Sequence, residues 1–145
     1  LRDQLKRLLE SRKMTEQEAE CIRIRDIRRF VESGLGQRMK KAAMKKHLYR
    51  EQPFVIQRSA SMLDDGWKNE TVLVQGIIDA YFMEEEEIVL VDYKTDRVKR
   101  GQEQKLIDLY HVQLEDYARA LERMTGKRVK EKIIYSFTLQ KEILL

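Results

Sequence analysis

The sequence of 145 residues contains few residues of three types: it has one cysteine, two histidines and one proline. Because Cys21 is alone, an internal disulfide and a zinc site built from thiolates are both excluded, which favours a reducing compartment. No apolar stretch approaches the ~20 residues that a membrane-spanning helix needs, and no signal peptide is recognisable. We therefore expect a cytoplasmic protein without a membrane partner.

The sequence also lacks a large excess of charge of one sign. Lysine and arginine total 29 and aspartate and glutamate 25, so the formal net charge is only +4, which is modest support for a nucleic-acid partner. The basic residues are nevertheless clustered, at 40–46, 97–100 and 127–132. A solvated helix or loop face is the ordinary explanation for any one such cluster.

The most informative segment is the apolar run 88–91 followed by Asp92, Tyr93 and Lys94. On a strand alternate side chains share a face, so Asp92 and Lys94 are predicted to point the same way, roughly 7 Å apart along the chain. Charges among apolar residues cost several kcal/mol unless they are paired, hydrated or bound to a metal. An isolated pair of this kind is usually a structural ion pair at a strand end. The neighbouring segments are therefore needed to distinguish a structural ion pair from a functional site.

A second apolar run, 71–82, carries Asp79 as its only charge and has apolar residues on both alternating faces, which predicts a strand buried on both sides. The acidic run 84–87 predicts the turn of an antiparallel hairpin that brings Asp79 back near Asp92. Two converging carboxylates repel each other unless a cation lies between them, and oxygen ligands suit Mg²⁺ or Mn²⁺. Lys94 could then stabilise charge on a phosphate or help to activate water.

The segment 102–123 has helical periodicity and ends before Gly126. Gln113 and Tyr117 are four residues apart and share a face, where they are either an ordinary half-buried pair or contacts to a substrate or to Lys94. The predicted apolar face consists of Leu106, Leu109, Tyr110, Leu114, Tyr117, Ala118, Ala120 and Leu121.

The remaining segments complete an α/β pattern. A helix beginning at Thr15 continues through the apolar positions 22–31, and a shorter helix is predicted over 37–45. A strand over 48–59 contains Pro53, which indicates an edge or a bend, and 61–70 is predicted to be a loop. Strands are predicted at 133–137 and 141–145. We expect one domain with a helical part at about 1–46 and a core at about 47–145, built on a mixed central sheet flanked by helices.

Three motifs occur in order: Gly76 with Asp79, Asp92 with Lys94 and Thr95, and Gln113 with Tyr117 on the helix. This combination resembles the RecB-like branch of the PD-(D/E)XK nucleases, and within it the nuclease domain of the A subunit of AddAB helicase-nucleases. The resemblance implies a restriction-endonuclease-like core with Mg²⁺ or Mn²⁺ at the strand ends. It also implies a bacterial DNA exonuclease acting in double-strand break repair and recombination.

The resemblance assigns roles to individual residues. It implies that Asp79, Asp92 and the backbone carbonyl of Tyr93 are metal ligands and that Lys94 is the catalytic lysine. Gln113 and Tyr117 match the motif that supports the site. Of the basic clusters, we favour Arg97, Lys99 and Arg100 for holding the phosphate backbone, since they directly follow the strand with Asp92.

Glu51 is a weaker candidate for an acid of the site. It lies in the segment 50–54, which has the pattern Arg-Glu-x-Pro-Phe of the same family. The alternative is a carboxylate that Arg50 or Arg58 neutralises at the start of a strand.

One departure from the family is the histidine that its members carry upstream as a further metal ligand. His47 and His111 lie in other contexts, so we expect the missing histidine before Leu1 and this chain to be excised from a helicase-nuclease. The implied partners are single-stranded DNA at a duplex end, helicase domains of the same chain and an AddB-like second subunit. The alternatives are a nuclease-like binding or assembly module without catalysis, and a nuclease of another branch of the superfamily.

Overall fold

The computed structural model describes residues 24–59 and 71–145. The predicted helix start at Thr15 and the predicted loop 61–70 lie outside these residues. The described elements, in chain order, are α3 (Ile24–Glu32), α4 (Gly34–Met44), β1 (Leu48–Ser59), β2 (Thr71–Glu84), β3 (Glu87–Lys94), α5 (Glu103–Thr125), β4 (Val129–Ser136) and β5 (Lys141–Leu144). None of the helices in these residues is long and apolar enough to cross a membrane.

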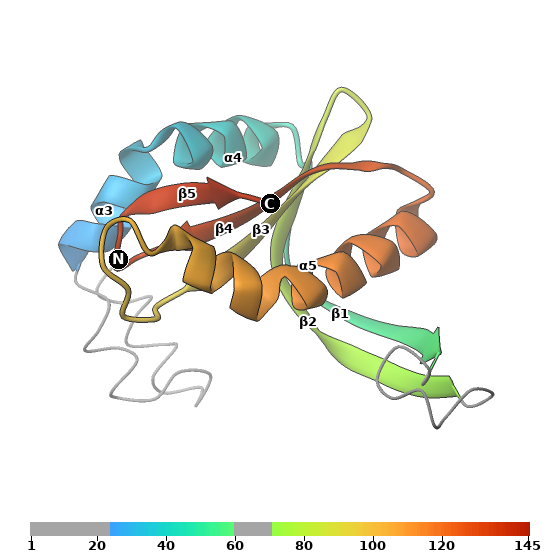
Figure 1. Ribbon diagram of the computed structural model, residues 1–145. Coiled ribbons are helices and arrows are strands. Elements are labelled where there is room, and N and C mark those ends of the chain that lie inside the picture. Colours follow the sequence, from blue (N-terminus) through green and yellow to red (C-terminus); the bar gives the residue numbers. More distant parts are fainter. Residues whose placement is uncertain (1–23, 60–70) are drawn as a thin grey trace, which may run out of the picture.

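The strands form one sheet in the order β1-β2-β3-β4-β5 (Figure 1). The pairs β1–β2, β2–β3 and β4–β5 are antiparallel, whereas β3 and β4 are parallel and are connected through α5. The predicted mixed sheet flanked by helices is therefore confirmed. Pro53 lies in β1 at an edge of the sheet, as predicted, where a missing backbone donor is tolerated.

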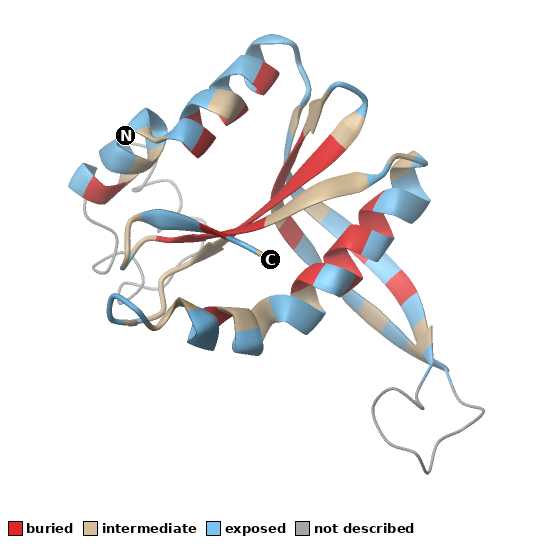
Figure 2. Ribbon diagram, turned by 45° about the horizontal axis from the view of Figure 1, so that its top comes forward, coloured by how far each residue is buried: buried red, intermediate tan, exposed pale blue. Residues whose placement is uncertain are grey.

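The two faces of the sheet carry two separate apolar clusters. On one face α5 packs its buried residues, Leu106, Leu114 and Leu121 among them, against side chains of β1, β2 and β3. On the other face Leu35, Met39 and Ala42 of α4 pack against β2, β3 and β4. Figure 2 shows the buried residues concentrated in the middle of the sheet and on the inner sides of these helices.

The predicted hairpin of β2 and β3 is confirmed, with a tighter turn than expected. Glu84 pairs with Glu87, so the turn consists of Glu85 and Glu86, both of which have a positive φ. Pairing between the two strands ends at Ala80 and Val91, although β2 stays paired with β1 as far as Thr71. Going away from the hairpin turn, Asp79 is therefore the first residue of β2 that is not paired with β3, and the sheet forks there.

Two predictions about burial were wrong. The strand predicted to be buried on both sides is buried only in its inner half, and Leu73 and Ile77 are 69% and 59% exposed. The fork explains this, because the outer half of β2 has only β1 as a neighbour. Leu109, predicted on the apolar face of the helix, is 67% exposed.

Two boundaries also differ from the prediction. Helix α4 begins at Gly34 rather than near residue 37, because the Ser33 side chain accepts a hydrogen bond from the Gly36 amide and caps the helix. A Cβ atom on Gly36 would lie 2.1 Å from the Phe30 carbonyl oxygen, so this close helix–helix approach requires glycine. Strand β4 begins at Val129, so part of the basic cluster 127–132 lies in a strand rather than on a solvated loop.

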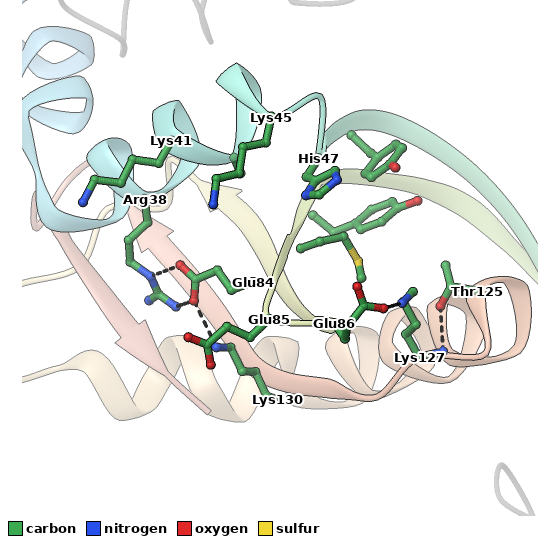
Figure 3. A pocket seen from close by; sticks show the side chains of 14 residues that line it. Arg38, Lys41, Lys45, His47, Glu84, Glu85, Glu86, Thr125, Lys127 and Lys130 are labelled. Atoms are coloured by element: carbon green, nitrogen blue, oxygen red, sulfur yellow. Dashed lines mark hydrogen bonds and ion pairs between the residues drawn. The ribbon is translucent and has the colours of Figure 1, made fainter.

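Arg38 fastens α4 to the sheet. Its guanidinium donates paired hydrogen bonds to the carboxylates of Glu84 in β2 and Glu131 in β4, at 2.8–3.0 Å. Lys130 adds a 3.0 Å ion pair to Glu84 (Figure 3). These donors lower the pKa of Glu84 to about 2, Arg38 contributing most. The cluster is a structural ion-pair network at the hairpin end of the sheet.

Candidate functional site

The candidate site lies at the fork between β2 and β3. Past Ala80 and Val91 the backbone of Tyr93 has lost its partner on β2, and the carboxylate of Asp79 accepts the Tyr93 N–H bond instead, at 2.9 Å. This places Asp79 against the strand that carries Asp92. The convergence of the two carboxylates that the hairpin predicted is therefore present.

Asp92 is buried, with only 2% of its surface exposed. Its Oδ2 atom makes no hydrogen bond of acceptable geometry to any described residue, although Lys94 Nζ lies 2.6 Å away. Burial raises the pKa of Asp92 to about 6, the positive charge of Lys94 opposes this, and Asp79 adds to it. Asp92 is thus a carboxylate held where its negative charge is poorly compensated.

Lys94 is held by three groups. Besides Asp92, its Nζ atom donates a hydrogen bond to Gln113 Oε1 at 3.0 Å and lies over the ring of Tyr110, 4.0 Å from the centroid. Gln113 and Tyr110 both belong to α5, so the helix fixes the position of the lysine. The prediction that Asp92 and Lys94 share a face is confirmed. Gln113 contacts Lys94, which is one of the alternatives predicted for it from the sequence.

Tyr110 is the residue that sequence reasoning missed. It was predicted only as part of the apolar face of the helix, yet its hydroxyl donates to Asp96 Oδ1 at 2.8 Å while its ring faces Lys94. Burial and the negative charge of Asp96 raise the pKa of Tyr110 to about 12. The available signal was its position three residues before Gln113, on the same side of the helix.

Tyr117 lies deeper on the same helix. Its side chain is buried and packs edge-on against Phe54 of β1, with ring centroids 5.1 Å apart. Burial, followed by the negative charges of Asp92 and Asp79, raises the pKa of its hydroxyl to about 12. Tyr117 therefore remains protonated beside the two carboxylates.

Glu51 lies on β1 opposite Asp79, between the pairs that Arg50 makes with Ala80 and Gln52 with Ile78. It is exposed and has a positive φ of 50°, an uncommon conformation for a residue with a side chain. Arg58 does not neutralise it, because Arg58 pairs with Asp116 of α5 at 3.2 Å. That part of the alternative interpretation was wrong.

Arg97, Lys99 and Arg100 lie on the connection between β3 and α5, directly after the site. All three side chains are exposed, and none forms an ion pair with another residue in 24–59 or 71–145. The two histidines, His47 and His111, are also exposed. The His111 ring lies within hydrogen-bond distance of the helix carbonyl of Ile107.

The donor set fits a hard divalent cation. Asp79 and Asp92 supply carboxylate oxygens from adjacent strands, the Tyr93 carbonyl directly follows Asp92 in sequence, and the buried Asp92 Oδ2 has Lys94 as its one close partner among the described residues. Oxygen donors of this type are those that Mg²⁺ and Mn²⁺ prefer. Among the described residues no group of three or more acidic, histidine or cysteine side chains gathers, so water and substrate oxygens would complete the coordination.

Comparison with known proteins agrees with this geometry. The family model of the PD-(D/E)XK nuclease superfamily matches residues 1–143. The chain is 39% identical over 145 residues to the A subunit of the ATP-dependent helicase/nuclease of Clostridium novyi, covering 97% of this chain and 12% of the relative. It is 41% identical over 141 residues to the protein of that name from Thermoanaerobacter sp., covering 94% and 11%.

A relative from Acetivibrio thermocellus with the same name is 46% identical over 129 residues, covering 86% of this chain and 10% of the relative. The chain thus spans about a tenth to an eighth of the length of the curated relatives it matches. The family model covers nearly every residue, and the relatives are 39–46% identical, so both comparisons support the same family. The chain belongs to the PD-(D/E)XK nuclease superfamily.

Proposed function

We propose that this chain is the metal-dependent DNA exonuclease domain of a helicase-nuclease that processes double-strand breaks. The observation that carries the proposal is the buried Asp92, whose Oδ2 atom lies 2.6 Å from the Nζ atom of Lys94, a lysine held by α5, and accepts no other hydrogen bond from a described residue, while the charge of Asp79 also acts on it. A structural ion pair would not need a second carboxylate at the same point. A metal-binding phosphodiesterase site does need one.

In this proposal Asp79, Asp92 and the Tyr93 carbonyl hold Mg²⁺ or Mn²⁺. The bound ion would polarise the phosphate and lower the pKa of a water molecule. Lys94 supplies positive charge where negative charge develops on the phosphate, and Gln113 keeps its ammonium group in place. Arg97, Lys99 and Arg100 hold the phosphate backbone by contacts that do not read the base sequence.

Two further residues belong to the proposal. Tyr117 supports the site as a protonated hydroxyl beside the carboxylates, and Glu51 is an additional acid opposite Asp79. The relatives are named for an ATP-dependent helicase/nuclease, which supports the wider context. We propose single-stranded DNA at a duplex end as substrate. The proposed protein partners are helicase domains of the same chain and a second, AddB-like subunit.

The test is cleavage of end-labelled single-stranded DNA with Mg²⁺ or Mn²⁺ by the parent protein and its Asp92→Ala variant. Removal of a group that stabilises the transition state lowers rates by about 10²–10³-fold, so at least this loss is expected. Asp108→Ala is the matched control, because Asp108 is an exposed aspartate on α5. Equal cleavage by parent and Asp92→Ala would refute the proposal, and metal-independent cleavage would refute its metal chemistry.

A further inference from the structure

The segment that joins β3 to α5, residues 95–102, carries the basic residues that the proposed function assigns to the phosphate backbone (Figure 1). We call this segment the basic connection. It contains no helix or strand, and it also carries one carboxylate, Asp96, directly before Arg97. A negative charge among cations that bind phosphate lowers the affinity by repulsion. The presence of Asp96 therefore requires an explanation other than contact with phosphate.

Asp96 is held by α5. Its Oδ1 atom accepts a hydrogen bond from the Tyr110 hydroxyl at 2.8 Å, and its carboxylate forms no ion pair with a lysine or arginine of residues 24–59 and 71–145. Both side chains are half-buried, which protects the bond from competing water. The centroid of the same tyrosine ring lies 4.0 Å from Lys94 Nζ. One side chain thus contacts Lys94 with its ring and the basic connection with its hydroxyl.

Further contacts hold the backbone of the basic connection. The Thr138 hydroxyl donates a hydrogen bond to the Thr95 carbonyl at 3.3 Å, and Val98 packs against the apolar cluster that α5 covers. Beyond Val98, the Lys99 N–H group donates to the Gln102 side chain at 3.2 Å. The three basic side chains, in contrast, are exposed: Arg97, Lys99 and Arg100. The backbone is therefore held to the protein, while the cations remain available to a ligand.

A segment that is already fixed binds phosphates more tightly than a mobile one, because its backbone does not have to be ordered on binding. Of the contacts above, only the bond between Asp96 and Tyr110 involves a charged group. Hydrogen bonds to charged groups are roughly twice as strong as neutral ones. This bond also sets the position of the basic connection relative to Lys94, since both contact the same tyrosine.

We infer that Asp96 is a positioning residue, which fixes the basic connection through Tyr110 so that its cations meet the phosphates next to the one at Lys94. The inference rests on the proposed function, which makes DNA the ligand and Lys94 part of the cleavage site. Tyr110 then has two separable roles. Its ring holds Lys94 for the chemical step, and its hydroxyl holds the basic connection for binding.

The experiment measures binding of fluorescein-labelled oligo-dT by fluorescence anisotropy over a series of salt concentrations, with EDTA present to prevent cleavage. Asp96→Ala removes the acceptor and is expected to weaken binding about 10- to 150-fold, the equivalent of about 1.5–3 kcal/mol for a hydrogen bond to a charged group. Tyr110→Phe removes the donor and is expected to give a loss of similar size. Because the two residues act as one unit, the double variant is expected to bind no more weakly than the single variants.

Asp96→Asn separates positioning from charge. It keeps an oxygen that accepts the Tyr110 hydroxyl and removes the negative charge, so its affinity is expected to stay within about fivefold of the parent. If Asp96 only repelled DNA, Asp96→Asn and Asp96→Ala would both bind more tightly than the parent. Asp108→Ala is the matched control, because it removes the same charge and the hydrogen bond from Gln104 at 2.9 Å, on the exposed side of α5. The control is not expected to weaken binding.

The triple variant Arg97→Ser, Lys99→Ser, Arg100→Ser tests whether Asp96 acts through the cations of the basic connection. Each phosphate contact to a single strand contributes about 0.7 to the slope of log K against log salt, so the triple variant is expected to reduce the slope by about 2.1. In this background Asp96→Ala is expected to cause no further loss of affinity, since the side chains that it positions are absent.

Cleavage of the same strand with Mg²⁺ separates positioning of the DNA from the chemical step. Asp96→Ala is expected to raise KM by a larger factor than it lowers kcat, because the Tyr110 ring remains over Lys94. A general loss of folded protein would instead lower the apparent kcat and leave KM unchanged. The ratio of the two effects therefore distinguishes a positioning role from a purely structural one.

Several results would overturn the inference: no binding of oligo-dT by the parent at low salt, unchanged or tighter binding by Asp96→Ala or Tyr110→Phe, or equal losses in Asp96→Ala and Asp96→Asn. A further loss from Asp96→Ala in the triple variant would also overturn it. These failures differ from failure of the proposed function. That failure is diagnosed by cleavage that persists in Asp92→Ala, whereas the binding measurements in EDTA do not depend on cleavage.

Discussion

Among the described residues, the network around Arg38 and the group at the fork are both clusters of carboxylates and cations on the sheet, and they behave in opposite ways. Around Arg38, the pKa of Glu84 is lowered to about 2. At the fork, the pKa of Asp92 is raised to about 6. The same residue types thus give a stabilised carboxylate at the hairpin end of the sheet and a destabilised one at the fork.

The number of donors and the access to water account for the difference. Glu84 receives two hydrogen bonds from Arg38 and an ion pair from Lys130, and its side chain is 28% exposed. Asp92 is almost wholly buried and has one cation, Lys94, which Gln113 also engages. The arrangement around Asp92 is therefore less favourable for the stability of the folded protein than the arrangement around Glu84. Such locally unfavourable arrangements are common at functional sites.

The largest contrast is expected in cleavage. Lys94→Met removes the charge at the fork and is expected to lower the cleavage rate by about 10²–10³-fold. Arg38→Met removes a charge of the same sign from the structural cluster and is expected to leave the rate per folded molecule within about twofold, because it touches no group of the site. Rates are measured under single-turnover conditions and corrected for the folded fraction. Similar losses in both variants would abolish the distinction between the clusters.

The second contrast is in stability. Arg38→Met leaves Glu84 and Glu131 facing each other without their shared partner. Loss of a buried partner costs about 3–5 kcal/mol, and partial exposure here reduces the expected loss of unfolding free energy to about 2 kcal/mol. Arg128→Met is the control, since Arg128 is 78% exposed in its pair with Glu87 and its loss should cost about 0.5 kcal/mol or less. Urea denaturation measures both, and equal costs would contradict the role given to Arg38.

The third contrast is the sign of the pH dependence. Asp92 has a folded-state pKa above its unfolded value, so the folded protein holds the extra proton between about pH 4 and 6 and loses stability as the pH rises through this range. In EDTA at pH 8, Asp92→Asn is therefore expected to be more stable than the parent by about 1–2 kcal/mol. The difference should vanish near pH 4.

Glu84→Gln sharpens this test because its sign is opposite. The pKa of Glu84 is lowered, so its contribution is present above about pH 4.5 and is lost as the pH falls towards 2. Glu84→Gln should therefore be less stable than the parent at pH 8. Thermal unfolding of both variants across pH 4–8 makes the measurement, and a shared sign would show that the two carboxylates are equivalent.

The smallest effect is expected at Tyr110. A cation over an aromatic ring is worth about 0.5–2 kcal/mol, so Tyr110→Leu should slow cleavage about 2- to 30-fold through misplacement of Lys94. Tyr110→Phe retains the ring and loses only the hydrogen bond to Asp96, so it should retain most of the rate. The change is expected in kcat rather than KM, and an effect confined to KM would argue against positioning of the lysine.

Local patterns predicted much of the fold and of the site. Alternation placed Asp92 and Lys94 on one face, and the apolar runs on either side of the acidic turn placed Asp79 near Asp92. The four-residue spacing of Gln113 and Tyr117 placed both towards the site. These inferences succeeded because each depends on the repeat of one element or on one short turn.

The failures involved contacts between distant segments. The exposure of Leu73 depends on where β2 leaves β3, and strand pairing ends without a marker in the sequence. The partner of Arg58 was misjudged because Asp116 is remote in sequence and joins it only when α5 crosses β1. Tyr110 was assigned to the core because an aromatic residue at helical spacing gives no sign that its ring faces a cation.

The fork in the sheet makes Asp79 part of the backbone as well as of the site. Its carboxylate replaces the carbonyl that β2 would have offered to the Tyr93 amide, so its orientation is set by a bond that the sheet itself requires. The hydrogen bond to the β3 backbone thus holds the Asp79 carboxylate in place, without a further side chain to position it. A consequence is that Asp79→Ala also orphans a backbone donor, whereas Asp79→Asn keeps an acceptor for it and isolates the loss of the negative charge.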